Sequence, residues 1–93
     1  MANKTIFKEY IPDMLDLNHC FTVETRKRAK VLFVGQDPDG ESAIWMEVDR
    51  EAKIIEKVFH VIGTSGSFPD DKRVRYVGTY IKASIVWHLY EEV

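Results

Sequence analysis

Histidine and cysteine are the side chains of this sequence that could do the most varied chemistry. His60 and His88 each lie in a run of alternating apolar residues, and His19 directly precedes the single cysteine, Cys20. Two facing imidazoles could bind a metal ion or respond to pH near neutrality. A metal site needs further ligands, however, and no cysteine or carboxylate stands at a recognisable ligand spacing. We therefore interpret both strand histidines as packed, hydrogen-bonded side chains and expect no metal site and no cofactor.

The segment TSGSFPDDK, which begins at Thr64, is the clearest candidate for a ligand-binding loop. It is small, polar and interrupted by glycine and proline, and it is the longest well-marked connection. Its backbone amides could bind a small anion or a nucleotide, with arginines as counter-charges. It lacks the Gly-Lys-Ser/Thr ending and the following helix of a P-loop, so a solvated connection is the simpler interpretation. The residues of this hypothetical anion site are Gly63, Thr64, Ser65, Gly66, Ser67, Arg73 and Arg75.

No catalytic constellation can be identified from residue types and spacing. Serines, histidines and acidic residues are present, but a nucleophile, base and orienting residue are recognised as a set only from their geometry. The adjacent acids Asp70 and Asp71 could bind a hard cation, yet neighbouring acids point apart and are more typical of a turn. We therefore expect that this protein is not an enzyme.

Aromatic side chains are 12% of the chain, and several fall in segments with the alternation of a β-strand. Some must belong to the core of so small a domain. Any that stay exposed are candidates for the dominant contacts with a protein partner. The residues of this hypothetical partner site are Trp45, Tyr76, Tyr80, His88 and Tyr90.

Four of the five partner-site candidates lie in residues 74–92. The pattern of this segment predicts two strands joined by a tight reversal. We place the reversal at Ile81-Lys82, although no Asn-Gly or Asp-Gly pair marks it. In the first half, Tyr76 and Tyr80 share one face, with Gly78 between them. A glycine within a strand indicates a β-bulge or a close approach of another segment. In the second half, a core face is predicted from Ala83, Ile85, Trp87 and Leu89.

Five further strands are predicted upstream from apolar alternation and turn signals. The nearly continuous apolar run KVLFVGQ at 30–36 is typical of a central strand with both faces covered. Asp37-Pro38-Asp39-Gly40 is the strongest turn signal, because proline presets φ and glycine accepts a positive φ. The strands are expected at residues 4–11, 21–25, 30–36, 42–49 and 54–63. Exposed connections are expected at residues 14–19 (with one helical turn), 26–28 and 50–53.

The fold class that follows is all-β. We expect one small domain over residues 1–93, with six to seven short antiparallel strands in a compact sandwich or partly open barrel. Edge strands of such a domain could pair with a partner or a second copy. A helix within residues 42–59 is the alternative, since REAKIIEKV contains good helix formers, but the β-branched and aromatic residues there favour a strand.

Composition narrows the class of protein. The 93 residues carry a formal net charge of -2, which makes nucleic acid an unlikely partner because its binders usually show a basic excess. A single cysteine excludes an internal disulfide framework. No apolar run is long enough for a signal peptide or a bilayer span. We therefore expect a cytoplasmic protein without a membrane anchor.

The order of these segments resembles a family of small proteins of unknown function found in bacteriophages and in bacteria. The similarity covers nearly the whole chain, and its most specific pieces are Val61-Ile62-Gly63-Thr64, Tyr76-Val77-Gly78-Thr79 and Val86-Trp87-His88. This resemblance implies a phage or prophage origin and supplies no catalytic or binding residues.

Three functional hypotheses follow. The first is a small phage accessory protein, in the host cytoplasm if phage-encoded, that binds and inhibits a host factor. Its partner would be a host or phage protein, and it could also form a homo-oligomer. The second is an anion- or nucleotide-binding module that uses the loop at residues 63–71. The third is a structural subunit of a phage particle.

Overall fold

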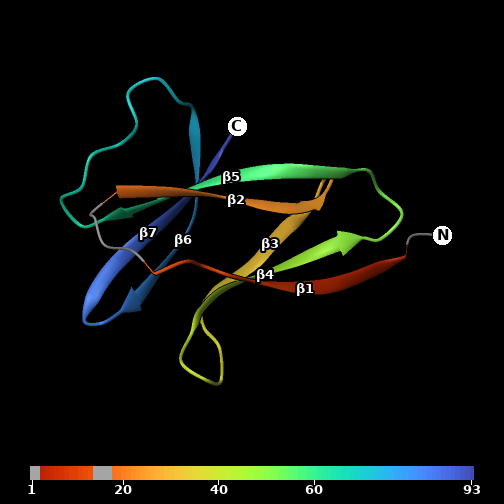
Figure 1. The fold of residues 1–93 in the computed structure, drawn as a ribbon, viewed down its shortest axis with the longest axis horizontal. Coiled ribbons are helices and arrows are strands. Elements are labelled where there is room, and N and C mark those ends of the chain that lie inside the picture. The colour runs from red at the N-terminus through yellow and green to blue at the C-terminus, as the bar shows by residue number, and fades with distance from the viewer. Residues whose placement is uncertain (1–2, 14–17) are drawn as a thin grey trace.

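A computed structural model describes residues 3–13 and 18–93. Within these ranges the chain forms strands and no helix, so the all-β prediction is confirmed (Figure 1). The strands pair in antiparallel order as a three-stranded sheet, β1-β4-β3, and a four-stranded sheet, β2-β5-β7-β6. Their bounds are β1 Lys4–Tyr10, β2 Asn18–Arg26, β3 Lys30–Gln36, β4 Ser42–Asp49, β5 Ile54–Gly63, β6 Val74–Lys82 and β7 Ile85–Glu92.

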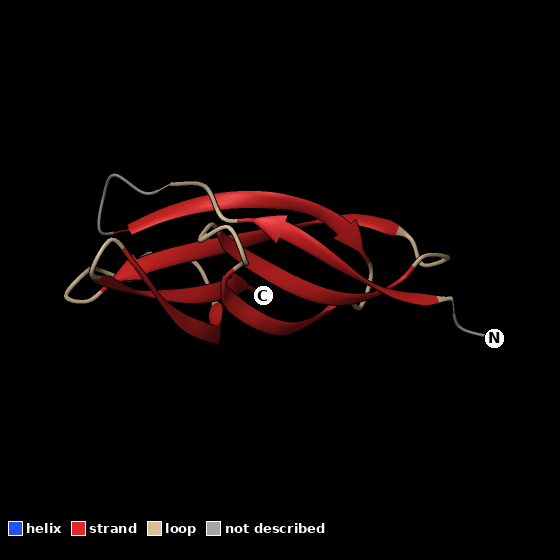
Figure 2. Ribbon diagram, turned by 90° about the horizontal axis from the view of Figure 1, so that it is seen from below, coloured by secondary structure: helices blue, strands red, loops and turns tan. Residues whose placement is uncertain are grey.

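The core lies between the inner faces of the two sheets. Seen edge-on, the molecule is a flattened stack of strands with its loops at the two ends (Figure 2), and its principal extents are 44 × 35 × 16 Å. Burial of each large apolar side chain contributes roughly 1.5–3 kcal/mol relative to exposure. The sheets are not joined into a closed barrel. The largest fully buried side chains are Ile44, Met46, Val48, Phe59, Val61 and Leu89.

Strand β2 is longer than the sequence predicted. It was expected at residues 21–25, whereas it runs from Asn18 to Arg26 and pairs along its whole length with β5. The expected connector at 14–19 therefore loses its last residues to the strand, and its residues 14–17 lie outside the described ranges. The connections predicted at 26–28 and 50–53 contain turns.

Strand β3 is an edge strand, so the prediction of a central strand with both faces covered was wrong. β4 is the middle strand of this sheet. Leu32 and Phe33 of β3 are 45% and 59% exposed. The register shifts between Val31 and Phe33, which directs the Phe33 ring to the outer face, where it lies beside Trp45. The apolar run thus places side chains on both faces of an edge strand, and Leu32 and Phe33 remain exposed although the run is nearly continuous.

The reversal between β6 and β7 lies at Ala83-Ser84, two residues after the predicted position. Both residues have positive φ, 54° and 65°. A two-residue turn with both φ values positive matches the right-handed twist of the flanking strands. Lys82 then pairs with Ile85, and Ala83 belongs to the turn rather than to the core face. The prediction failed because neither residue type signals this conformation.

A β-bulge at Gly78 separates Tyr76 from Tyr80. The register of β6 against β7 shifts between Tyr76 and Gly78, as a strand glycine had indicated. The extra residue reverses the alternation, so the prediction that both tyrosines share a face was wrong. Tyr76 is opposite Tyr90 and 55% exposed, whereas Tyr80 is opposite Trp87 and 6% exposed.

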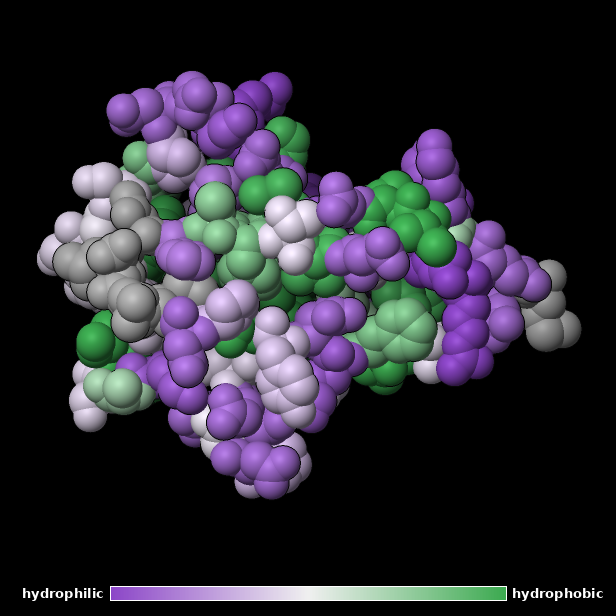
Figure 3. Space-filling model, in the orientation of Figure 1, coloured by the Kyte–Doolittle hydropathy of each residue, from purple (hydrophilic) through white to green (hydrophobic). Residues whose placement is uncertain are grey.

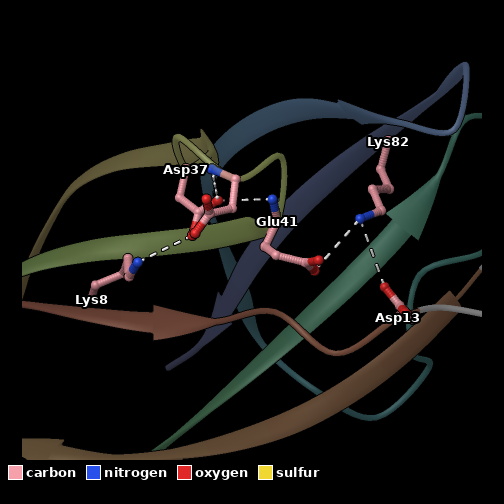
Figure 4. Close-up of polar contacts among 6 residues, drawn as sticks. Lys8, Asp13, Asp37, Glu41 and Lys82 are labelled. Atoms are coloured by element: carbon pink, nitrogen blue, oxygen red, sulfur yellow. Dashed lines mark hydrogen bonds and ion pairs between the residues drawn. The ribbon is translucent and has the colours of Figure 1, made fainter.

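The turn predicted at residues 37–40 is confirmed and is organised by the carboxylate of Asp37 (Figure 4). Its Oδ1 accepts hydrogen bonds from the backbone N–H groups of Asp39 and Glu41, both at 2.9 Å. Its Oδ2 lies 3.1 Å from Nζ of Lys8 on β1. The Glu41 N–H, aided by Lys8, lowers the pKa of Asp37 below its ordinary value. Gly40 takes the left-handed conformation, with φ of 85°.

Candidate functional site

An aromatic cluster lies on the outer face of the four-stranded sheet. We call it the aromatic face and define it by Phe68, Tyr76, His88 and Tyr90. β-Strand alternation directs Trp87, Leu89 and Glu91 of β7 inward, and therefore His88 and Tyr90 outward. The bulge in β6 brings Tyr76 to the same side, and the loop after β5 adds Phe68.

Tyr90 is the centre of the aromatic contacts. Its ring centroid is 5.0 Å from that of Phe68, with the planes tilted by 60°. It is 5.5 Å from the ring of Tyr76, in an edge-to-face arrangement. Phe68 and Tyr76 are 54% and 55% exposed, while Tyr90 is half-buried beneath them. Such ring pairs contribute about 0.5–1.5 kcal/mol beyond area burial, so the exposed rings are held in defined positions.

His88 of β7 is connected through hydroxyl groups to β6 and to the loop that follows β5. Its Nδ1 lies 3.1 Å from Oγ1 of Thr79 on β6, and its Nε2 lies 3.2 Å from Oγ1 of Thr64 after β5. The Thr79 hydroxyl also lies 2.6 Å from the hydroxyl of Tyr76. A neutral imidazole donates through one nitrogen and accepts through the other, and hydroxyls serve either role. The expectation of a hydrogen-bonded His88 is confirmed, and the network orients Tyr76.

His60 lies on the same face but does not meet His88. It is opposite Tyr90, whereas His88 is opposite Ile62. His60 Nε2 forms a 2.9 Å contact with Oε2 of Glu92, so it is also hydrogen-bonded as expected. Among the residues that the structure describes, no group of three or more histidine, cysteine or acidic side chains could hold a metal ion.

The loop that follows β5 forms one wall of a hollow of about 240 Å³ beside the aromatic face. Ser65 has a positive φ of 75°, and the Gly66 N–H donates to the Gly63 carbonyl at 2.7 Å, which turns the loop over the sheet. Predicted loop residues and predicted partner residues therefore share one site. The lining residues are Ile62, Gly63, Thr64, Ser65, Gly66, Phe68, His88 and Tyr90. Ser67 follows Gly66 in the same exposed loop.

The arginines proposed as counter-charges are placed differently. Arg75 is next to Tyr76 on β6 and forms an ion pair with Glu91, which also lies 3.3 Å from Nζ of Lys57. Glu91 is 6% exposed, so this cluster belongs to the inner side of the sheet. The Arg73 side chain is exposed, and its carbonyl accepts a hydrogen bond from the Val93 N–H. The structure does not bring Arg75 to the hollow.

One comparison with known proteins places the chain in a family. A family model described as domain of unknown function (DUF7352) matches residues 2–93. The chain belongs to the DUF7352 family. The sequence-based expectation of a family of unknown function is confirmed to this extent. No curated protein and no solved structure matches the chain.

Two of the predicted partner residues of this DUF7352 chain lie away from the aromatic face. Trp45 is half-buried on the outer face of the three-stranded sheet, with its ring centroid 5.6 Å from that of Phe33. Tyr80 is in the core. Conversely, sequence reasoning missed Phe68 as a site residue, although it is the one large apolar side chain in a polar loop.

Figure 3 shows how polarity is distributed on one face of the DUF7352 chain. The projecting turn at residues 37–41 is mostly hydrophilic, and hydrophobic side chains are visible between polar ones over the strands. The part of the chain that the structure describes contains no helix that is long and apolar enough to cross a membrane.

Proposed function

We propose that this protein is a small phage or prophage accessory protein that binds a protein partner through the aromatic face and inhibits a host factor in the cytoplasm. The observation that carries the proposal is the pair of exposed rings, Phe68 and Tyr76, fixed against half-buried Tyr90. Aromatic side chains, tyrosine above all, dominate the binding energy of many protein interfaces.

Preorganisation strengthens this argument. Ordering a flexible side chain on binding costs about 0.5–1.5 kcal/mol, and a ring already held in place avoids much of that cost. Tyr76 is held by Tyr90 and by the hydroxyl of Thr79. Its exposed ring could therefore enter a partner's apolar recess, while its hydroxyl keeps a hydrogen bond.

The charges near the aromatic face favour a protein over a nucleic acid. Lys72, His60 and Glu92 border the face, and Lys72 Nζ lies 3.9 Å from Glu92. Single-stranded nucleic acid also stacks on aromatic side chains, but it requires a positive groove along its backbone. The mixed charges here and the net charge of -2 do not provide one.

The test compares wild-type protein with Tyr76→Ala and Phe68→Ala in affinity capture from a bacterial host lysate, followed by titration of the captured protein. We expect each variant to bind about tenfold more weakly or worse, as truncation of a central aromatic residue does. Phe33→Ala is the matched control, because Phe33, on the other sheet, is 59% exposed and so comparable with Phe68 and Tyr76. Equal capture by all three variants, or no retained partner at micromolar concentration, would refute the proposal.

The hollow beside the aromatic face favours a second candidate function, the binding of a small anion or nucleotide. The loop residues Gly63–Gly66 line it together with His88 and Tyr90. A ligand that binds only the folded state raises the melting temperature. Thermal melting with a panel of nucleotides and inorganic phosphate tests this candidate, and a flat response would remove it.

A further inference from the structure

β1 is an edge strand, and one row of its backbone groups points away from its own sheet. Among the described strands it is hydrogen-bonded to β4 alone, and Figure 1 shows it along the lower margin of the molecule. The Ile11 N–H donates to the Ser42 carbonyl, and the Arg50 N–H donates to the Asn3 carbonyl, both at 2.9 Å. Odd-numbered residues of β1 therefore face β4. Backbone groups alternate along a strand, so those of the even-numbered residues form the outer edge. These residues are Lys4, Ile6, Lys8 and Tyr10, and all four are exposed.

The other edge strands carry features that oppose pairing with a further strand. β3 and β6 are each interrupted by a register shift, and they lie against each other. β2 is regular, but its outer edge is polar and carries the exposed carboxylate of Glu24. Bulges and charges are the usual devices that block edge-to-edge pairing. β1 pairs with β4 without a register shift, and its residues Ile6 and Tyr10 are 58% and 54% exposed. It is therefore the edge best suited to accept a strand.

The two lysines of β1 do not block this edge, because each is held over its own sheet. Lysine is a common protecting residue on edge strands. Here Lys8 Nζ lies 3.1 Å from Oδ2 of Asp37, at the end of β3 (Figure 4). Lys4 Nζ lies 3.5 Å from Oε2 of Glu47 on β4. Both ammonium groups are partly neutralised and directed away from the outer edge.

We propose that two copies of this protein pair β1 with β1, in antiparallel order, about a two-fold axis at Phe7. The two three-stranded sheets then join into one continuous sheet. Even-numbered residues lie opposite even-numbered residues, so each outward-pointing N–H and C=O has a partner in the other copy. At the far edge of each sheet, β3 lies against β6 of its own copy. The sheet therefore does not extend further, and the assembly closes as a dimer.

Charge selects this register among the possible ones. With the axis at Phe7, Lys4 lies opposite the partner's Tyr10, and Ile6 lies opposite the aliphatic stem of the partner's Lys8. A cation over an aromatic ring is attractive, and within one copy Lys8 Nζ already lies 4.7 Å from the centroid of the Tyr10 ring. An axis at Ile6 would place Lys4 opposite Lys8, and an axis at Lys8 would place that lysine opposite itself. Like charges directly opposite are destabilising.

The inner face of β1 is self-complementary in the same register. Phe7 meets its own counterpart at the axis, and Thr5 lies opposite the partner's Glu9. Phe7 is half-buried and packs against the core cluster, so a second ring beside it buries more of its surface. The Thr5 hydroxyl can donate to the Glu9 carboxylate, and both side chains are half-buried. A two-fold interface requires self-complementarity of this kind.

Sedimentation velocity of the full-length protein, from about 5 µM to about 1 mM, tests for the dimer. The contact is a single strand wide, which is small for a stable interface, so we expect a dissociation constant on the order of 10–100 µM. Amide hydrogen exchange, followed by NMR at low and high concentration, locates the contact. The N–H groups of Ile6 and Lys8 should exchange several-fold more slowly at high concentration. Those of Phe7 and Glu9, which face β4, should not change.

Two substitutions of Ile6 test the register and control for each other, since both remove the same apolar side chain. Ile6→Glu places a carboxylate opposite the partner's Lys8, whereas Ile6→Lys places an ammonium group there. We expect Ile6→Lys to dimerise about tenfold more weakly than Ile6→Glu. Within one copy Ile6 lies opposite Glu47, which favours the lysine variant. Monomer stability, checked by thermal melting at about 5 µM, therefore cannot produce the expected order.

The control variants change exposed residues elsewhere. Thr22→Lys alters the outer edge of β2, and Tyr76→Ala alters the aromatic face, so both should dimerise like the wild type. Tyr76→Ala also separates this dimer from binding of a partner through the aromatic face. Three results would overturn the proposal: a monomer up to about 1 mM, equal dimerisation of the two Ile6 variants, or slowed exchange that does not alternate along β1.

Discussion

The side chain of Val34 in β3 lies against the backbone of Gly78 in β6. A Cβ atom built on Gly78 would be 2.3 Å from Cγ1 of Val34, far inside van der Waals contact. The two strands belong to different sheets and are not hydrogen-bonded to each other. This contact closes one side of the molecule, and the bulge at Gly78 sends Tyr76 outward and Tyr80 inward.

Gly78→Ala should therefore destabilise the protein. The methyl group must displace Val34, which is 8% exposed and packed in the core cluster. Overpacking of this kind typically costs about 1–3 kcal/mol. Urea unfolding of the variant and the wild type measures the difference in free energy of unfolding.

Gly35→Ala is the matched control for this prediction. The Cβ of an alanine there would lie 2.8 Å from the edge of the Phe33 ring, which is 59% exposed and free to swing away. We expect a cost below about 1 kcal/mol. A Val34→Ala, Gly78→Ala double variant should lose less than the sum of the single changes, because the clash is gone. Additive losses would contradict the contact.

Truncation of the two tyrosines that flank the bulge should destabilise the protein to very different extents. Tyr80→Ala removes a ring from the core and should cost about 3–5 kcal/mol. Tyr76→Ala removes an exposed ring that contacts Tyr90 and should cost only about 1 kcal/mol. Chemical unfolding of both variants checks the prediction, and similar losses would mean that the bulge does not reverse the alternation.

The turn between β6 and β7 offers a stabilising change. Ala83 and Ser84 both adopt the left-handed conformation, which costs residues with a Cβ about 1–2 kcal/mol each. Replacing the pair by Asn-Gly, which favours a type I′ turn, should stabilise the protein by about 1–2 kcal/mol. The same Asn-Gly pair at Ile81-Lys82 should destabilise it, because these residues lie within β6. Thermal melting of the two variants distinguishes the two positions of the turn.

Local signals in the sequence predicted most of the elements. The bounds of β4 and β5 follow from apolar alternation, and those of β3 follow from a nearly continuous apolar run that ends at the turn residues beginning with Asp37. Gly78 indicated a bulge or a close approach of another segment, and the structure has both, the second through Val34. These features depend on neighbours along the chain, which is the information a single sequence carries most directly.

The arrangement of the site depends on strand pairing, which no local signal encodes. One extra residue, Val77 next to Gly78, exchanges the faces of every residue on one side of it, so Tyr76 and Tyr80 could not be assigned by counting. The same exchange of faces places Arg75 opposite Glu91, with which it forms an ion pair on the inner side of the four-stranded sheet. Phe68 joined Tyr90 because the loop turns back over the sheet. Polarity alone gave no reason to expect that path.

Acid titration should reveal the contribution of Asp37. Its folded-state pKa lies below the ordinary 3.8, through the Glu41 N–H and then Lys8. A lowered folded-state pKa gives stability that is present above the unfolded-state pKa and is lost as pH falls through the folded-state value. Asp37→Asn keeps an oxygen for the turn but removes the charge beside Lys8. The variant should melt below the wild type at pH 7, and the gap should close below about pH 4.

The exposed neighbour Asp39 provides the control for net charge in this experiment. Asp39→Asn changes the charge of the same turn without removing the ion pair that joins Asp37 to Lys8 at 3.1 Å. Melting temperatures of the three proteins are measured between pH 7 and about pH 2, at constant ionic strength, because screening weakens exposed charge pairs. We expect only the Asp37→Asn difference to shrink in acid. A difference that stays constant over this range would show that the amide disturbs the turn itself, and that the carboxylate charge contributes nothing to stability.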